Sequence, residues 1–95
     1  MNATAVLGRP EHVTFQVVEG DAILIHMETG TYFSLNKIGT EFWQALDGRQ
    51  SIAQHATALA QRYGVEEQVV IADLVELAAD MASHNLLERI GPLSG

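Results

Sequence analysis

Apolar and polar residues alternate near the N-terminus, and this alternation predicts a small antiparallel sheet. The alternation covers residues 13–17 and has the period of a half-buried strand. A more continuously apolar run follows over 22–27, and a run rich in β-branched and aromatic residues follows over 31–35, which is a strand composition. Turn-forming residues at 19–21 and 28–30 separate the three runs. Three short strands joined by tight turns are typical of an antiparallel meander or ribbon.

After the third run, the apolar residues change to helical spacing. Repeats three and four residues apart predict three helices, each with a suitable starting residue and a stop signal. The helices are expected to begin at Asn36, Ser51 and Glu66 and to end near Gly48, Gly64 and Ser83. A short apolar segment over 86–90 favours a final strand or an extended cover. We expect flexible tails over 1–11 and 91–95, and one domain over 12–90.

The order of these elements indicates an α+β domain. A three-stranded antiparallel β-ribbon followed by three helices, in fewer than 100 residues, suggests a winged helix-turn-helix-like arrangement. This inference concerns the fold alone, because unrelated functions share one fold.

The third predicted helix is more apolar than a single buried face requires. A helix packed on one side needs an apolar stripe about 100° wide. Four residues form such a stripe, namely Val70, Leu74, Leu77 and Met81. Further apolar residues between 69 and 82 lie outside it. Two interpretations follow: the helix is the centre of the domain and is covered on both sides, or part of its second face forms one wall of a groove.

The third predicted strand is the candidate for the opposite wall. If it lies at the edge of the ribbon, its free N–H and C=O groups form a template for another chain. An extended peptide can then add as a further strand, with main-chain hydrogen bonds setting its register and side-chain pockets setting its specificity. Alternation of side chains along a strand favours Phe33 and Leu35 pointing inward and Tyr32 pointing outward.

The charge balance argues against nucleic acid as a partner. The chain has 95 residues, of which 5 are basic and 12 acidic, and its net charge is −7. Binding to nucleic acid draws most of its affinity from cationic groups that face phosphates, whereas the basic residues of this chain are scattered singly. A winged-helix transcription factor is therefore the least favoured alternative.

The hydropathy pattern also indicates the cellular compartment of the protein. No apolar run approaches the roughly 20 residues that span a membrane, and the chain does not begin with the basic-then-apolar pattern of a secretion signal. We expect a cytoplasmic protein with no membrane partner.

No motif for catalysis, for a cofactor or for a metal stands out. The chain has no Cys, and no two of its four His residues have the i, i+4 spacing of a helical metal site. Its Ser residues lie in no nucleophile motif, and its Gly residues form no phosphate-binding loop. We therefore expect a protein that is not an enzyme and that needs no cofactor or metal.

One ordered set of residues, spread over roughly 12–90, has the composition and spacing of a known family. The set is Tyr32-Phe33-Ser34-Leu35-Asn36, Gly39, Phe42-Trp43, Leu46-Asp47-Gly48, Ser51-Ile52, Ala56, Leu59, Tyr63-Gly64-Val65, Asp73-Leu74 and Asn85-Leu86-Leu87. It resembles the PqqD-like family, whose members recognise the precursors of ribosomally made, post-translationally modified peptides (RiPPs). Within that family, it is most similar to the stand-alone lasso-peptide branch.

The resemblance implies that the leader segment of a precursor pairs with the third strand and lies against the third helix. The implied peptide-binding residues are Thr31, Tyr32, Phe33 and Ser34 on the strand and Val70, Asp73, Leu74 and Leu77 on the helix. It further implies that the protein presents the leader to a separate leader peptidase or other modifying enzyme in lasso-peptide biosynthesis. The alternative within the family is a peptide chaperone for a radical SAM enzyme in pyrroloquinoline quinone biosynthesis, and the residues leave this alternative open.

Overall fold

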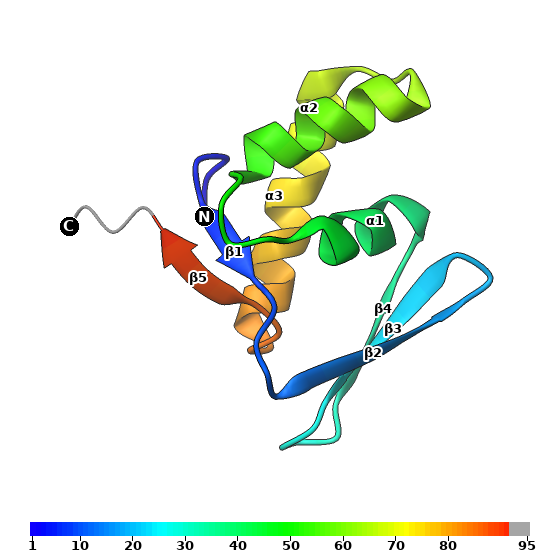
Figure 1. The fold of residues 1–95 in the computed structure, drawn as a ribbon, viewed down its shortest axis with the longest axis vertical. Helices are drawn as coiled ribbons and strands as arrows, with labels where there is room; N and C mark the ends of the chain where they lie inside the picture. The colour runs from blue at the N-terminus through cyan, green and yellow to red at the C-terminus, as the bar shows by residue number, and fades with distance from the viewer. Residues whose placement is uncertain (92–95) are drawn as a thin grey trace.

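The computed structural model describes residues 1–91, which form three helices, a three-stranded sheet and a separate two-stranded ribbon (Figure 1). The α+β class and the order of a three-stranded antiparallel sheet followed by three helices are confirmed. The C-terminal tail expected over 91–95 lies outside the described residues, except that Gly91 ends the last strand.

The sheet is an antiparallel meander in which the third strand of the predicted ribbon lies at the edge. Strands β2 (Val13–Val18), β3 (Asp21–His26) and β4 (Tyr32–Leu35) are ordered β2-β3-β4. Leu24 of β3 lies opposite Phe33 of β4, and this register continues along the pair. β4 therefore has one strand neighbour among the described residues.

Each of the first two helices begins at a side-chain cap that the sequence predicts. In α1 (Lys37–Ala45), the Asn36 carboxamide oxygen accepts the Gly39 N–H at 2.8 Å. In α2 (Ile52–Tyr63), Ser51 and Gln54 form a reciprocal capping box. These caps satisfy N–H groups that a helix start leaves without partners, so the chain turns from β4 into α1 at a defined residue.

Helix α3 (Glu67–Ser83) is the central helix of the domain, passing behind α1 and α2 in Figure 1. Its buried residues form one stripe: Val70, Leu74, Ala78 and Met81. Ile71 and Val75 on one flank and Leu77 on the other are half-buried. The helix is therefore not covered on both sides, because Val69, Ala72 and Ala79 are exposed. Leu77 is the apolar residue on the flank that faces β4. No helix within residues 1–91 combines the length and apolarity that a membrane crossing requires.

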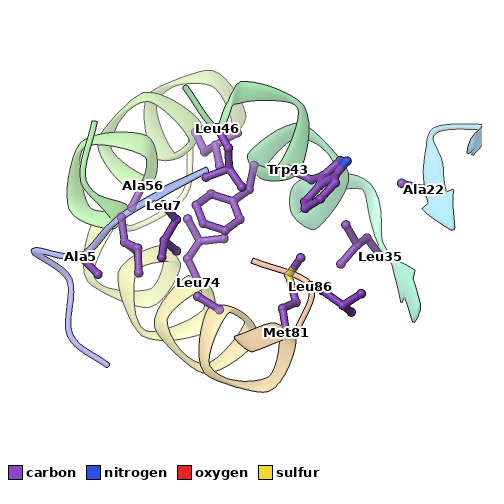
Figure 2. Packing of buried hydrophobic residues seen from close by; sticks show 14 of the residues in the cluster. Ala5, Leu7, Ala22, Leu35, Trp43, Leu46, Ala56, Leu74, Met81 and Leu86 are labelled. Atoms are coloured by element: carbon purple, nitrogen blue, oxygen red, sulfur yellow. The ribbon is translucent and has the colours of Figure 1, made fainter. Parts of the chain in front are cut away.

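The core joins α3 to both other helices and to the sheet. Trp43 and Phe42 of α1 are completely buried, and Figure 2 shows Trp43 beside Leu35 at the end of β4. On the other side of the same cluster, Leu7 and Ala56 lie close together. One continuous core therefore fixes the position of β4 relative to α3.

The N-terminal segment corrects the prediction of a flexible tail over 1–11. Residues Val6–Gly8 form strand β1, which pairs antiparallel with β5 (Glu88–Gly91). Leu7 is 1% exposed and Ala5 is fully buried. A strand of three residues is too short to show the period of 2, and its partner lies about 80 residues further along the chain, so the sequence pattern gave no sign of it.

We predict that Leu7→Ala lowers the free energy of unfolding by about 2–5 kcal/mol, because it leaves a cavity in the core. Urea unfolding followed by far-UV circular dichroism measures this change. Glu11→Ala, at an exposed position of the same segment, should change the stability by less than about 0.5 kcal/mol. If both substitutions change the stability equally and only slightly, this segment does not contribute to the core and is a flexible tail.

Candidate functional site

The free edge of β4 presents the main-chain groups of alternate residues. The His26 N–H donates to the Thr31 carbonyl oxygen at 2.9 Å, which makes this pair a hydrogen-bonded one in the register of β3 and β4. Hydrogen-bonded pairs alternate along an antiparallel ladder, so the N–H and C=O of Phe33 point toward β3. The main-chain groups of Tyr32 and Ser34 consequently point away from the sheet.

The far end of β4 is held by a buried hydroxyl. The Ala22 N–H donates to Thr40 Oγ1 at 2.7 Å, and the Thr40 hydroxyl donates to the Leu35 carbonyl oxygen at 3.4 Å. Thr40 thus bridges β3 and β4 at the point where the chain turns into α1. Because a buried polar group without a partner is costly, this bridge favours a single position of the strand end.

The side chains of β4 alternate as the sequence predicts. Tyr32 is 70% exposed, whereas Leu35 belongs to the core. Phe33 is half-buried, and its ring centroid lies 5.7 Å from that of His84, which caps the C-terminal end of α3. One end of the strand is therefore close to one end of α3.

A pocket of about 390 Å³ lies where β4 ends, α1 begins and α3 passes. It is lined by Ser34, Leu35, Asn36, Ile38, Gly39, Asp73, Leu74 and Leu77. Gly39 permits the close approach of α1 to α3 here, because a Cβ at this position would lie 3.2 Å from Leu77 Cδ2. This distance is tighter than ordinary van der Waals contact, so a larger residue would require the Leu77 side chain to shift by a few tenths of an ångström.

A second pocket, of about 640 Å³, continues along α3 and is lined by Asp73, Glu76, Leu77 and Asp80. The two pockets share Asp73 and Leu77. We call them together the α3 groove. It begins at the end of β4, and its helical wall carries three carboxylates, those of Asp73, Glu76 and Asp80.

The residues implied by the family resemblance lie at different depths in this region. On the strand, Thr31, Tyr32 and Ser34 are exposed and Phe33 is half-buried. On α3, Asp73 and Leu77 line both pockets, and Leu74 lines the first although only 1% of its surface is exposed. Val70 is 4% exposed and lines neither pocket, so it supports the wall from within the core.

Several residues of the groove were not predicted from the sequence. Asn36, Ile38 and Gly39 come from the first turn of α1, and Glu76 and Asp80 come from α3. The spacing of Glu76 and Asp80 at three and seven residues from Asp73 was visible in the sequence and places all three on one helix face. The contribution of α1 depends on how closely it approaches α3, which no local pattern encodes.

Another pocket, of about 350 Å³, lies between α1 and α2, away from β4. Burial lowers the pKa of His55 in its wall, and the Asp47 carboxylate acts in the opposite direction. The pKa of Asp47 is itself lowered, first by the Gln50 N–H and then by the Arg49 N–H, both of which donate to it. This pocket has no open strand beside it.

Comparison with known proteins adds a family match. The model of the family described as "Coenzyme PQQ synthesis protein D (PqqD)" matches residues 21–87, which include β3, β4 and all three helices. No curated protein matches the chain.

Two solved structures have a similar fold. The structure described as TbiB1 in complex with the TbiA(beta) leader peptide has a TM-score of 0.76 and 27% sequence identity, over 85% of this chain and 94% of that chain. The solution structure of the PqqD truncation of Methylobacterium extorquens PqqCD, described as a stand-alone RiPP recognition element, has a TM-score of 0.75 and 26% identity. It covers 94% of this chain and 100% of that chain.

We predict that proline is tolerated at Tyr32 but not at Phe33. Tyr32→Pro removes an N–H that points away from the sheet, and proline is accepted at sheet edges. Phe33→Pro removes a donor from the β3–β4 ladder and leaves a buried acceptor without a partner, which should cost at least about 2 kcal/mol of unfolding free energy. Chemical denaturation of both variants measures the difference, and equal destabilisation would show that the edge has been assigned wrongly.

Proposed function

The chain belongs to the PqqD family, and from this we propose that it binds the leader segment of a ribosomally made precursor peptide by strand addition at β4. In this proposal the protein performs no catalysis itself and needs no cofactor or metal. It acts in the cytoplasm, where the precursor is synthesised.

The observation that carries the proposal is the open edge of β4 directly beside the α3 groove. A guest strand can accept and donate main-chain hydrogen bonds at Tyr32 and Ser34, while alternate side chains of the guest enter the groove. Each such hydrogen bond contributes about 0.5–1.5 kcal/mol net, so two residues at the edge fix the register of the guest without supplying high affinity. The pockets must therefore supply much of the affinity and the specificity.

The shape of the groove is suitable for an extended peptide. Its floor is formed by the buried Leu74 and the half-buried Leu77. Its polar lining residues are Ser34, Asn36 and the carboxylates of α3. Burial of apolar guest side chains against this floor contributes about 25 cal/mol per Å² of apolar surface removed from water. The similar structure of TbiB1, which contains a leader peptide, supports the same class of guest for this chain.

We further propose that the bound leader is presented to a separate leader peptidase in lasso-peptide biosynthesis. The similarity to TbiB1 over 94% of its length supports this branch. The similarity to the M. extorquens PqqD truncation, at almost the same TM-score, supports the alternative of a chaperone for a radical SAM enzyme in pyrroloquinoline quinone biosynthesis. Co-purification with a candidate peptidase or a candidate radical enzyme, each with and without the leader, discriminates between them.

A winged-helix transcription factor has less support. The most central helix, α3, carries four acidic residues and no basic residue within Glu67–Ser83, so it would repel the phosphates that a recognition helix contacts.

We predict that a synthetic leader peptide perturbs the amide resonances of residues 31–35 and 69–78 in the ¹⁵N-labelled protein. Strand addition at β4 and contact with α3 change the surroundings of these amides. Perturbations confined to the α1–α2 pocket, or no binding at all, would contradict the proposal.

Two matched variants sharpen this titration. Leu77→Asp places a charge among the apolar side chains of groove and guest and should weaken binding at least tenfold. Val65→Asp makes the same kind of change at a site that is 47% exposed and lies outside the groove, and should leave the affinity within about twofold. Leu74 is unsuitable for this test because it belongs to the core, so its substitution reports on folding.

A further inference from the structure

The wall of the groove that α3 contributes is acidic. Asp73, Glu76 and Asp80 lie at positions i, i+3 and i+7 of one helix, and all three are exposed. We call them the acid row. From the 1.5 Å rise per residue of an α-helix, the row extends for about 10 Å along the groove.

Little within residues 1–91 neutralises the acid row. Among residues 1–91, the ion pairs are Arg62 with Glu41 at 3.1 Å, between α2 and α1, and His84 with Asp80 at 3.8 Å. Neither Asp73 nor Glu76 has a cationic partner in the described structure. The Lys37 ammonium, at the start of α1, lies 5.7 Å from the centre of the Tyr63 ring rather than over the row.

The direction of α3 adds to the negative potential. The C-terminal end of a helix carries a partial negative charge, and α3 has no basic residue in its last turn. The acid row spans residues 73–80 of this helix, so Asp80 lies at the start of its last turn. Like charges four residues apart, as in Glu76 and Asp80, destabilise a helix. The row therefore opposes the stability of α3 and gives the groove a negative potential.

We propose that the guest carries basic residues in the segment that crosses α3, so that the acid row selects Lys- or Arg-containing leaders. This inference rests on the proposed function and specifies its substrate class. Residues two apart in an extended guest lie on one face and about 7 Å from each other. A pair of Lys or Arg residues at i and i+2 can therefore reach both ends of the row with their long side chains.

The test uses three synthetic peptides that share the leader sequence and differ at two positions two residues apart in the segment that contacts α3. These positions hold two Lys, two Gln or two Glu residues. At about 50 mM salt, the Lys peptide should bind roughly tenfold more tightly than the Glu peptide, since several weakly screened charge pairs act together. At about 1 M salt, where the screening length falls to about 3 Å, the difference should shrink to about twofold.

Two triple variants of the protein locate the effect. Replacing the acid row by D73N, E76Q and D80N should remove the preference for Lys over Glu. The control variant E11Q, E19Q and E88Q changes three exposed acidic residues outside the groove and alters the net charge equally. This control should retain the preference, because a local charge row, rather than the net charge of the protein, determines it.

The possible outcomes separate this inference from the proposed function. Equal binding of the Lys, Gln and Glu peptides to the wild-type protein would overturn the inference and leave leader binding intact. Loss of the preference in the control variant would also overturn it, because net charge would then be the cause. Failure of all three peptides to bind would overturn the proposed function and this inference together.

Discussion

A strand with one neighbour, held beside a central amphipathic helix, is the constraint on which this structure depends. β4 is paired on one side only, and its outward main-chain groups face water rather than another element. An open edge is a hazard in most domains because it invites aggregation. Here the sheet is short, the edge strand has four residues, and a charged row lies along the adjoining groove. Two copies of the chain that approached edge to edge would bring acidic groups together, which favours a guest of different charge over a second copy.

The rest of the fold holds this edge in position. Trp43 and Phe42 fill the centre of the core, and Thr40, on the same helix, bridges β3 and β4. Gly39 allows that helix to approach α3 closely. The β1–β5 ribbon adds Leu7 to the core on the side away from the sheet. Because these contacts converge on α1 and α3, the distance between the two walls of the groove is set by packing and does not rely on the guest.

Much of this arrangement can be predicted from the sequence, and the failures have identifiable causes. Alternation at period 2 located the first sheet strand, and apolar or β-branched runs between turn signals located the other two. The caps at Asn36 and Ser51 located the starts of two helices, because all of these signals are local. Strand β1 was missed because three residues carry no period and their partner is distant in the chain. Val70 illustrates a different limit: helical periodicity gives the face on which a residue lies, but its depth depends on what packs against that face. The acid row did not stand out as part of a site, since only the fold shows that one end of it, at Asp73, shares a pocket with the end of β4 and the start of α1.

The central claim is that the edge of β4 is open in the free protein and becomes paired when the leader binds. Amide hydrogen exchange of individual β4 residues, with and without saturating leader, tests this most directly. The account predicts that the Phe33 amide is protected in both states, whereas the amides of Tyr32 and Ser34 exchange rapidly in the free protein and at least about tenfold more slowly in the complex. If the Tyr32 and Ser34 amides stay unprotected in a saturated complex, or are already protected in the free protein, strand addition at this edge is contradicted.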